Sequence, residues 1–265
     1  MSKIVLHHNG QDFAASGTPA DISIPLRFDG PQPGFFGAES ASARPMHAGD
    51  FIGDTRLGGS CNADHVDFIP HCNGTHTECV GHLTTERVAV NTLATAPLYV
   101  AAVVTVEPVQ NPGETATLHA HKPDRLITRA ALEPLLGDAP DALVIRTLPN
   151  DSDKREREWR SGSTPYFSID AMDLLVERGV QHLLVDTPSV DRLDDDRLAA
   201  HRAFWGLPPG SRSIENASRP QATITELVFV PDEVVDGLYL LDLQIAPFVS
   251  DAAPSRPLLH RVSRD

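Results

Sequence analysis

The stretch at residues 98–106 constrains the fold of this chain more than any other feature of its sequence. It is a continuous apolar run rich in β-branched residues, which is typical of a strand buried on both faces. Shorter apolar runs at 142–147 and 180–185 are predicted to form further strands. The centre of the chain is therefore predicted to supply the buried strands of a sheet.

Helices are predicted between and after these strands. Thr128 is a plausible N-cap for a helix at 130–136. Ser168 is a plausible N-cap for a helix at 169–178, whose apolar residues recur at helical spacing. A third helix is predicted at 194–204. This alternation of strands and helices predicts a mixed α/β domain.

The two ends of the chain are predicted to be β-rich, with strands at 3–6, 21–26, 222–230 and 238–245. Residues 27–59 are rich in Gly, Pro, Ala and Ser, so regular structure is not expected there. A loop of this length inside a compact domain is usually functional or disordered. We interpret it as a flap or a subunit-contact loop, with disorder as the alternative.

Composition limits the size of the fold and the kind of partner. A chain of 265 residues is expected to form one domain. The formal net charge of -14 argues against a nucleic-acid partner, because such proteins place Lys and Arg against the phosphates. No apolar run reaches the roughly 20 residues that span a bilayer, and no secretory signal is recognisable. We therefore expect a cytoplasmic protein that acts on a small molecule, without a membrane.

Three cysteines, Cys61, Cys72 and Cys79, form no CxxC pair, and an odd number makes a poor disulfide framework. They are expected to be free thiols. Two readings stay open at this point. A thiolate could join a metal site, or Cys72 or Cys79 could be a nucleophile paired with His76.

A cluster of metal-ligand residue types lies just before the central apolar run. Three histidines and one glutamate fall within twelve residues, and they are His71, His76, Glu78 and His82. Imidazole and carboxylate groups are usual ligands for Zn²⁺, Mn²⁺ or Fe²⁺. His76 and Glu78 are two residues apart, so in an extended segment their side chains project to the same face. The segment predicts a metal site; the alternative is a surface loop whose histidines face solvent.

This segment resembles the signature His-x-Gly-Thr-His-x-Asp-x-Pro-x-His of the cyclase family, which includes bacterial kynurenine formamidases and isatin hydrolases. Residues 185–191, which precede a helix with His201, are similar to a second landmark of that family. Residues 251–256 resemble its Asp-Ala-x-Pro-x-Arg ending, and 21–26 fit its opening strand. The resemblance implies one α/β domain over 1–265, with a mixed sheet of the swivelling β/α/β type.

The resemblance also implies a site. The implied metal ligands are His71, His76, Glu78, His82, His201 and Glu226, with Glu215 as the competitor of Glu226. His201, Glu226 and His82 are the implied catalytic residues. The implied cofactor is Zn²⁺ or Mn²⁺, as one or two ions. Family sites are commonly completed across a subunit contact, so a homodimer or homotetramer is expected.

The chain departs from the signature at three positions. Asn73 is an extra residue between His71 and Gly74, Glu78 replaces the usual aspartate, and Val80 replaces the usual proline. The inserted residue could rotate His71 away from the site, or a local bulge could absorb it. The sequence does not decide between these outcomes.

The expected reaction is hydrolysis of an amide, such as a formamide or a cyclic amide, or of a related acyl bond, by water that the metal activates. His201 would act as a general acid or base, because the ordinary pKa of histidine suits proton exchange at neutral pH. One alternative is a metal-dependent lyase or dehydrating cyclase that acts on a small carbonyl substrate. Another is a protein that binds metal without catalysis.

Overall fold

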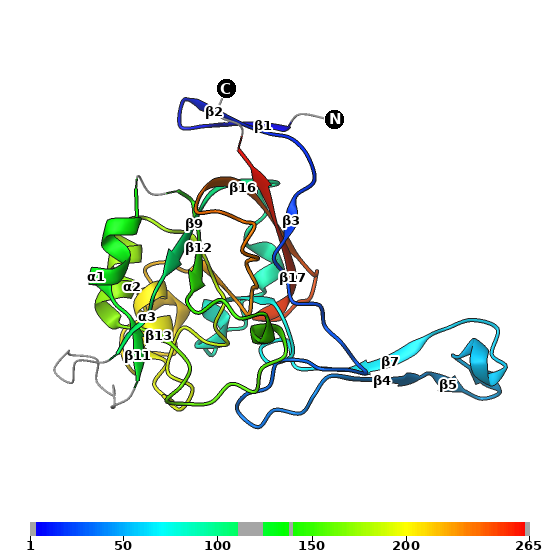
Figure 1. The fold of residues 1–265 in the computed structure, drawn as a ribbon. Helices are drawn as coiled ribbons and strands as arrows, with labels where there is room; N and C mark the ends of the chain where they lie inside the picture. Colours follow the sequence, from blue (N-terminus) through cyan, green and yellow to red (C-terminus); the bar gives the residue numbers. More distant parts are fainter. Residues whose placement is uncertain (1–3, 111–123, 138–139, 263–265) are drawn as a thin grey trace.

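The computed structural model describes residues 4–110, 124–137 and 140–262. Its centre is a barrel of seven strands in the order β16-β9-β12-β14-β15-β8-β17, closed by pairing of β17 with β16 (Figure 1). A short eighth strand, β3, pairs with β17. The bounds are β3 (Ala20–Asp21), β8 (His76–Cys79), β9 (Tyr99–Val106), β12 (Ala142–Thr147), β14 (His182–Val185), β15 (Thr223–Glu226), β16 (Gly237–Ile245) and β17 (Ala252–Arg261).

The barrel is a mixed sheet, as predicted. Strands β9, β12, β14 and β15 are parallel neighbours, whereas β8, β16 and β17 pair antiparallel with theirs. The apolar runs at 98–106 and 142–147 became β9 and β12, because parallel strands covered on both faces need apolar side chains on both. One core, with Val103, Val144 and Leu241, fills the barrel, and a second packs between the barrel and the helices.

Among the described residues, three α-helices cover one side of the barrel (Figure 1): α1 (Arg129–Leu132), α2 (Ile169–Glu177) and α3 (Ala199–Trp205). Thr128 caps α1, since its hydroxyl accepts a hydrogen bond from the amide of Ala131. Ser168 stands at the N-cap of α2, but its hydroxyl contacts the carboxylate of Asp170 and the carbonyl of Ile127 rather than a helix amide. The predicted helix at 194–204 begins only at Ala199, because Leu198 has a left-handed backbone with φ of 52°. No helix in the described ranges has the length and apolar character needed to cross a membrane.

Short elements complete the chain. β1 (Ile4–His8) and β2 (Gln11–Ala15) form a hairpin at the N-terminal end. β10 (Val109–Gln110), β11 (Arg125–Ile127) and β13 (Tyr166–Phe167) form a separate small sheet. The 3₁₀ helices are η1 (Thr55–Leu57), η2 (Val80–His82), η3 (Val90–Thr92), η4 (Glu133–Leu135), η5 (Ser152–Arg155) and η6 (Ile214–Asn216).

The expectation that residues 27–59 lack regular structure was wrong in part. Residues 42–67 form an arm that extends away from the barrel (Figure 1). In this arm, β4 (Ser42–Pro45) pairs with β7 (Asp64–Asp67), and β5 (His47–Ala48) pairs with β6 (Phe51–Ile52). These strands are two to four residues long and mostly exposed, so they leave no apolar pattern in the sequence.

Strand β17, the longest in the part of the chain that the structure describes, was also missed. It contains Pro254 and Pro257, which lack a backbone N–H and argue against a strand inside a sheet. The expected strand at 21–26 is limited to β3, and only an isolated bridge between Ser23 and Val228 continues it.

Candidate metal centre

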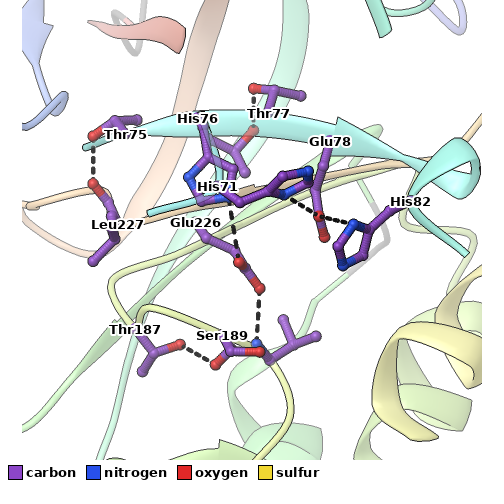
Figure 2. Close-up of polar contacts among 12 residues, drawn as sticks. His71, Thr75, His76, Thr77, Glu78, His82, Thr187, Ser189, Glu226 and Leu227 are labelled. Carbon is purple, nitrogen blue, oxygen red and sulfur yellow. Dashed lines mark hydrogen bonds and ion pairs between the residues drawn. The ribbon is translucent and has the colours of Figure 1, made fainter. Parts of the chain in front are cut away.

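The buried half of the site is built by pairing of β8 with β15. His76 and Glu226 are register partners in this antiparallel pair, so their side chains lie on the same face, and Glu78 follows two residues along on that face. His76 Nε2 lies 3.5 Å from Glu226 Oε2. Because His76 Nδ1 donates to the carbonyl of Gly74, its Nε2 is the nitrogen that faces the carboxylates (Figure 2).

Helix α3 adds His201 to this face. His201 Nε2 lies 2.8 Å from Glu78 Oε1 and 3.5 Å from Glu226 Oε1. The side chains of His76, Glu78, His201 and Glu226 are all at most 5% exposed. The inner half of the site is therefore a closed group of two histidines and two carboxylates.

His71 and His82 form the open edge of the site. His71 Nδ1 lies 3.2 Å from Glu78 Oε2, and the turn η2 brings His82 Nδ1 to 3.9 Å from the same oxygen (Figure 2). Their side chains are 26% and 27% exposed. The structure thus brings together all six residues that the resemblance implied, with solvent access on the side of these two histidines.

Asp251 belongs to this open edge, and we did not predict it from the sequence. Its Oδ2 lies 2.8 Å from His71 Nε2 and 3.5 Å from His82 Nδ1. The residue begins the 251–256 segment that resembles the family ending, which was the only signal of its importance. Its contact with His71 crosses 180 positions of sequence, so no local pattern could pair the two residues.

Asp191 holds His201 from behind, and it too was not predicted as a site residue. Its Oδ2 accepts a 2.6 Å hydrogen bond from His201 Nδ1, and the carboxylate also accepts from the backbone amides of Ala200 and His201. The neighbouring amide of Val190 donates to Glu226 Oε1 at 2.9 Å. The 186–191 segment after β14 therefore orients two of the inner residues at once, as carboxylate partners do for histidine ligands of metals.

The extra residue Asn73 does not remove His71 from the site. The backbone amides of Cys72 and Asn73 both donate to the carbonyl of Ile69, so the insertion is absorbed in a tight turn. The ring centre of His71 lies 5.4 Å from that of His76. Of the two outcomes that the sequence left open, the local bulge is the one found.

The ionisation of the site follows from its buried carboxylates. Burial alone would lower the pKa of His201, but the charge of Glu78 and the bond to Asp191 hold that pKa well above its ordinary value. Burial also opposes protonation of His71, yet Asp251 and Glu78 raise its pKa to about 10. Burial would raise the pKa of Glu78, but the nearby His82 and His201 keep it well below the ordinary value. Among the described residues, the carboxylates of Glu78, Glu226 and Asp251 form ion pairs with histidines only.

The donor set fits a divalent metal. His76 Nε2, Glu78 Oε1 and His201 Nε2 are buried, and none of the three makes a hydrogen bond in the described part of the chain. Glu78 Oε1 and His201 Nε2 lie 2.8 Å apart, but this contact does not have the geometry of a hydrogen bond. Such orphaned atoms are costly unless something else binds them. Three overlapping groups place their ligand atoms within 4.8 Å of one another: His71, His76 and Glu78; His71, His82 and Asp251; and Glu78, His201 and Glu226. Nitrogen and carboxylate donors of this kind suit Zn²⁺ or Mn²⁺.

The other candidate residues, Glu215 and the cysteines, do not join the metal-binding groups found among the described residues. Glu215 is exposed on η6. Burial raises the pKa of Cys72 to about 11 and that of Cys79 to about 12, which disfavours the thiolate form that a nucleophile or ligand needs. No cysteine belongs to the metal-binding groups found among the described residues. The geometry therefore favours the histidine and carboxylate site over a thiol-based one.

Comparison with known proteins gives a consistent family. The model of the Cyclase family, described as "Putative cyclase", matches residues 20–192. A kynurenine formamidase of Bacillus cereus is 27% identical over 209 residues, covering 77% of this chain and 82% of that protein. The kynurenine formamidase of Bordetella petrii is 25% identical over 202 residues, covering 76% and 81%.

Solved structures share the fold. Isatin hydrolase A from Labrenzia aggregata, bound to benzyl benzoate, aligns with a TM-score of 0.62 and 14% identity over 92% of this chain and 94% of that one. A protein described as a "potential metal-dependent hydrolase with cyclase activity" aligns with a TM-score of 0.63 and 15% identity over 91% and 96%. His201, Glu226 and Asp251 lie beyond the segment that the family model matches, and the structure brings them to the histidines of the 71–82 segment.

Proposed function

This chain belongs to the cyclase family, and from that membership we propose that it is a metal-dependent hydrolase that cleaves an amide or related acyl bond of a small molecule. The observation that carries the proposal is the convergence of His76 Nε2, Glu78 Oε1 and His201 Nε2, which are buried without hydrogen-bond partners among the described residues. A purely structural cluster would satisfy these atoms internally.

Three or four of the residues His71, His76, Glu78, His201 and Glu226 would hold the metal, with His82 at the open edge. A divalent ion there would lower the pKa of a water molecule and polarise a carbonyl oxygen. Three or four protein ligands with one side open to solvent is the pattern of a catalytic site rather than a closed structural one.

Proton transfer is best assigned to the open edge. His201 is buried, and its two nitrogens face Asp191 and the glutamates, which suits a ligand better than a group that reaches substrate. His82 is partly exposed, and its Nδ1 lies 3.5 Å from Asp251. We therefore assign to His82, with Asp251 beside it, the delivery of a proton to the leaving nitrogen.

The substrate class is proposed from the relatives. Those named kynurenine formamidase act on a formamide, and those named isatin hydrolase act on isatin, a cyclic amide. Both are small amides that are not peptides. We propose that this chain cleaves a small formamide or cyclic amide.

We also propose that the protein is a homodimer or homotetramer in the cytoplasm. The arm at 42–67 exposes Met46, Leu57 and Val66, and short paired strands of this kind are marginally stable in water alone, which favours cover by a second copy. The location in the cytoplasm is proposed because the three cysteines of the protein are free thiols, as expected in a reducing compartment. Sedimentation of wild type and of Leu57→Glu tests the assembly, and a monomeric wild type would contradict it.

The first test is metal analysis of the purified protein by mass spectrometry, on wild type and on a His76→Ala/His82→Ala double variant. We expect roughly one or two equivalents of Zn or Mn in wild type, and loss in the variant. Metal-loaded protein is then assayed with aryl formamides and isatin in ¹⁸O-labelled water. Label in the product supports a hydrolase, and turnover without label would indicate the lyase or dehydrating cyclase. A wild type that cannot be loaded with any divalent metal would refute the proposal.

A further inference from the structure

Asn73, the residue that interrupts the metal-binding signature, is one of the best-satisfied polar side chains near the site. It is 2% exposed. Its Oδ1 accepts a 2.6 Å hydrogen bond from the amide of Ile69, and its Nδ2 donates to the carbonyl of Glu39 at 3.0 Å. An inserted residue that only needed to be accommodated could face solvent. This one is buried and bonded at both ends.

The first of these bonds acts on the turn that carries His71. The backbone amides of Cys72 and Asn73 close this turn onto the carbonyl of Ile69, and the side chain of Asn73 occupies the free amide of the same Ile69. Residues of this type commonly fold a side chain back onto nearby backbone to fix a turn. His71 lies inside this doubly closed turn, and from there its Nδ1 reaches 3.2 Å from Glu78 Oε2.

The second bond joins the turn to the 27–41 loop. Gln32 closes that loop by exchanging hydrogen bonds with the backbone of Ala41 and by donating to the carbonyl of Arg27. Asn73 Nδ2 donates to the carbonyl of Glu39 in this loop, and it also makes a longer contact of 3.5 Å with Gln32 Oε1. The loop is therefore held by Gln32 as well as by Asn73, whereas the Ile69 amide is held by Asn73 itself.

We infer that Asn73 is a positioning residue for metal binding: its Oδ1, bonded to the Ile69 amide, sets the turn that aims His71 at Glu78. The side chain of the inserted residue thus keeps His71 in a ligand position from which the extra residue would otherwise displace it. This inference rests on the proposed metal site. It predicts that removing the Asn73 side chain weakens metal binding although no ligand is changed.

The experiment is titration of metal-free protein with Co²⁺, followed by its visible absorption, together with a competition titration for Zn²⁺. Loss of a group that orients a metal ligand typically costs 10–100-fold in affinity. For Asn73→Ala we expect at least a tenfold loss and an altered cobalt spectrum. Asn73→Asp keeps an oxygen for the Ile69 amide but turns a second oxygen toward the Glu39 carbonyl, so we expect it to bind cobalt more tightly than Asn73→Ala and more weakly than wild type.

Two control variants separate this role from general loosening. Asn62→Ala removes a comparable bond in the arm, where Asn62 Oδ1 accepts from the amide of Thr55 at 3.0 Å, and it should leave cobalt binding unchanged. Gln32→Ala loosens the 27–41 loop while the bond between Asn73 and Ile69 stays, and it should also bind cobalt normally. The unfolding temperature of each metal-free variant reports the cost in stability separately.

The outcomes are distinct. If Asn73→Ala binds cobalt within threefold of wild type, the inference is wrong. If Gln32→Ala weakens binding as much as Asn73→Ala, the loop rather than the turn positions His71, and the inference is again wrong. Should Asn73→Ala fail to fold, Asn73→Ser, whose hydroxyl is too short for the bond to Ile69, replaces it with the same criteria. A wild type that binds no cobalt would instead overturn the proposed function.

Discussion

The carboxylate of Asp191 offers the sharpest test of how this site is organised. It accepts from three donors: the backbone amides of Ala200 and His201, at 2.7 and 3.1 Å, and His201 Nδ1 at 2.6 Å. In Asp191→Asn, one of the two oxygens becomes an NH₂ group, which cannot accept a hydrogen bond. At least one of the three donors must then face another donor.

If the NH₂ group faces His201, it donates to Nδ1, and the proton of the imidazole moves to Nε2. That nitrogen lies 2.8 Å from Glu78 and would no longer have a lone pair for a metal. We expect metal affinity to fall 10–100-fold, the typical effect of losing such a partner, which equals about 1.4–2.8 kcal/mol. If the oxygen faces His201 instead, the amide of Ala200 at the start of α3 loses its acceptor, at a cost of about 1 kcal/mol in stability.

The assay is a competition titration against a chelating indicator for Zn²⁺, with thermal unfolding of the metal-free protein beside it. Asp21→Asn is the matched control, because Asp21 forms a 2.8 Å ion pair with Arg256 on β17 and contacts no site histidine. The reasoning is refuted if Asp191→Asn binds Zn²⁺ within threefold of wild type while only its unfolding temperature falls. Asp191 would then be a cap for α3 and no more.

Three further predictions concern the open edge, the pH dependence and the distal glutamate. Asp251→Asn should lower the pKa of His71 from about 10, because the charge of Asp251 helps to raise that pKa. Titration of the histidines by NMR in metal-free protein measures the change. If the pKa of His71 does not move, Glu78 alone sets it. Because the folded-state pKa values of His71 and His201 are raised, the stability that they contribute to metal-free protein is fully present below pH ~6.5 and should be lost as pH rises through those raised values, which for His71 is about 10. Metal must displace those protons, so Zn²⁺ affinity should rise with pH over the same window, and calorimetry that finds no proton release on binding would contradict this. Glu226→Gln should weaken metal binding, whereas Glu215→Gln should not; equal effects in metal analysis would remove Glu226 from the ligand set.

Some features of this protein could be predicted because they depend on neighbours in sequence. The strands at 99–106 and 142–147 could be found because both of their faces are buried, so nearly every position is apolar. His76 and Glu78 could be placed on one face because side chains of an extended strand alternate. The donor types within 71–82 were enough to predict a metal site.

Other features depend on register and closure, and only the tertiary structure decided them. Glu226 joins the site because β15 lies opposite β8 with Glu226 beside His76, whereas Glu215 ends on an exposed turn. β17 follows from barrel closure against β16, which outweighs the local cost of its two prolines. The inserted residue Asn73 is held by a hydrogen bond to Ile69, four residues away, and by a second one to a loop more than thirty residues upstream.

Asp191 and Asp251 illustrate the physical reason. An aspartate in a loop carries no periodic signal, and its role is set by which histidine the fold brings within hydrogen-bond distance. The sequence by itself determined which chemical groups were available and which strands would be buried. The packing of α3 and the closure of the barrel decided which of those groups meet, because contacts between residues far apart in the chain are fixed only when the whole core forms.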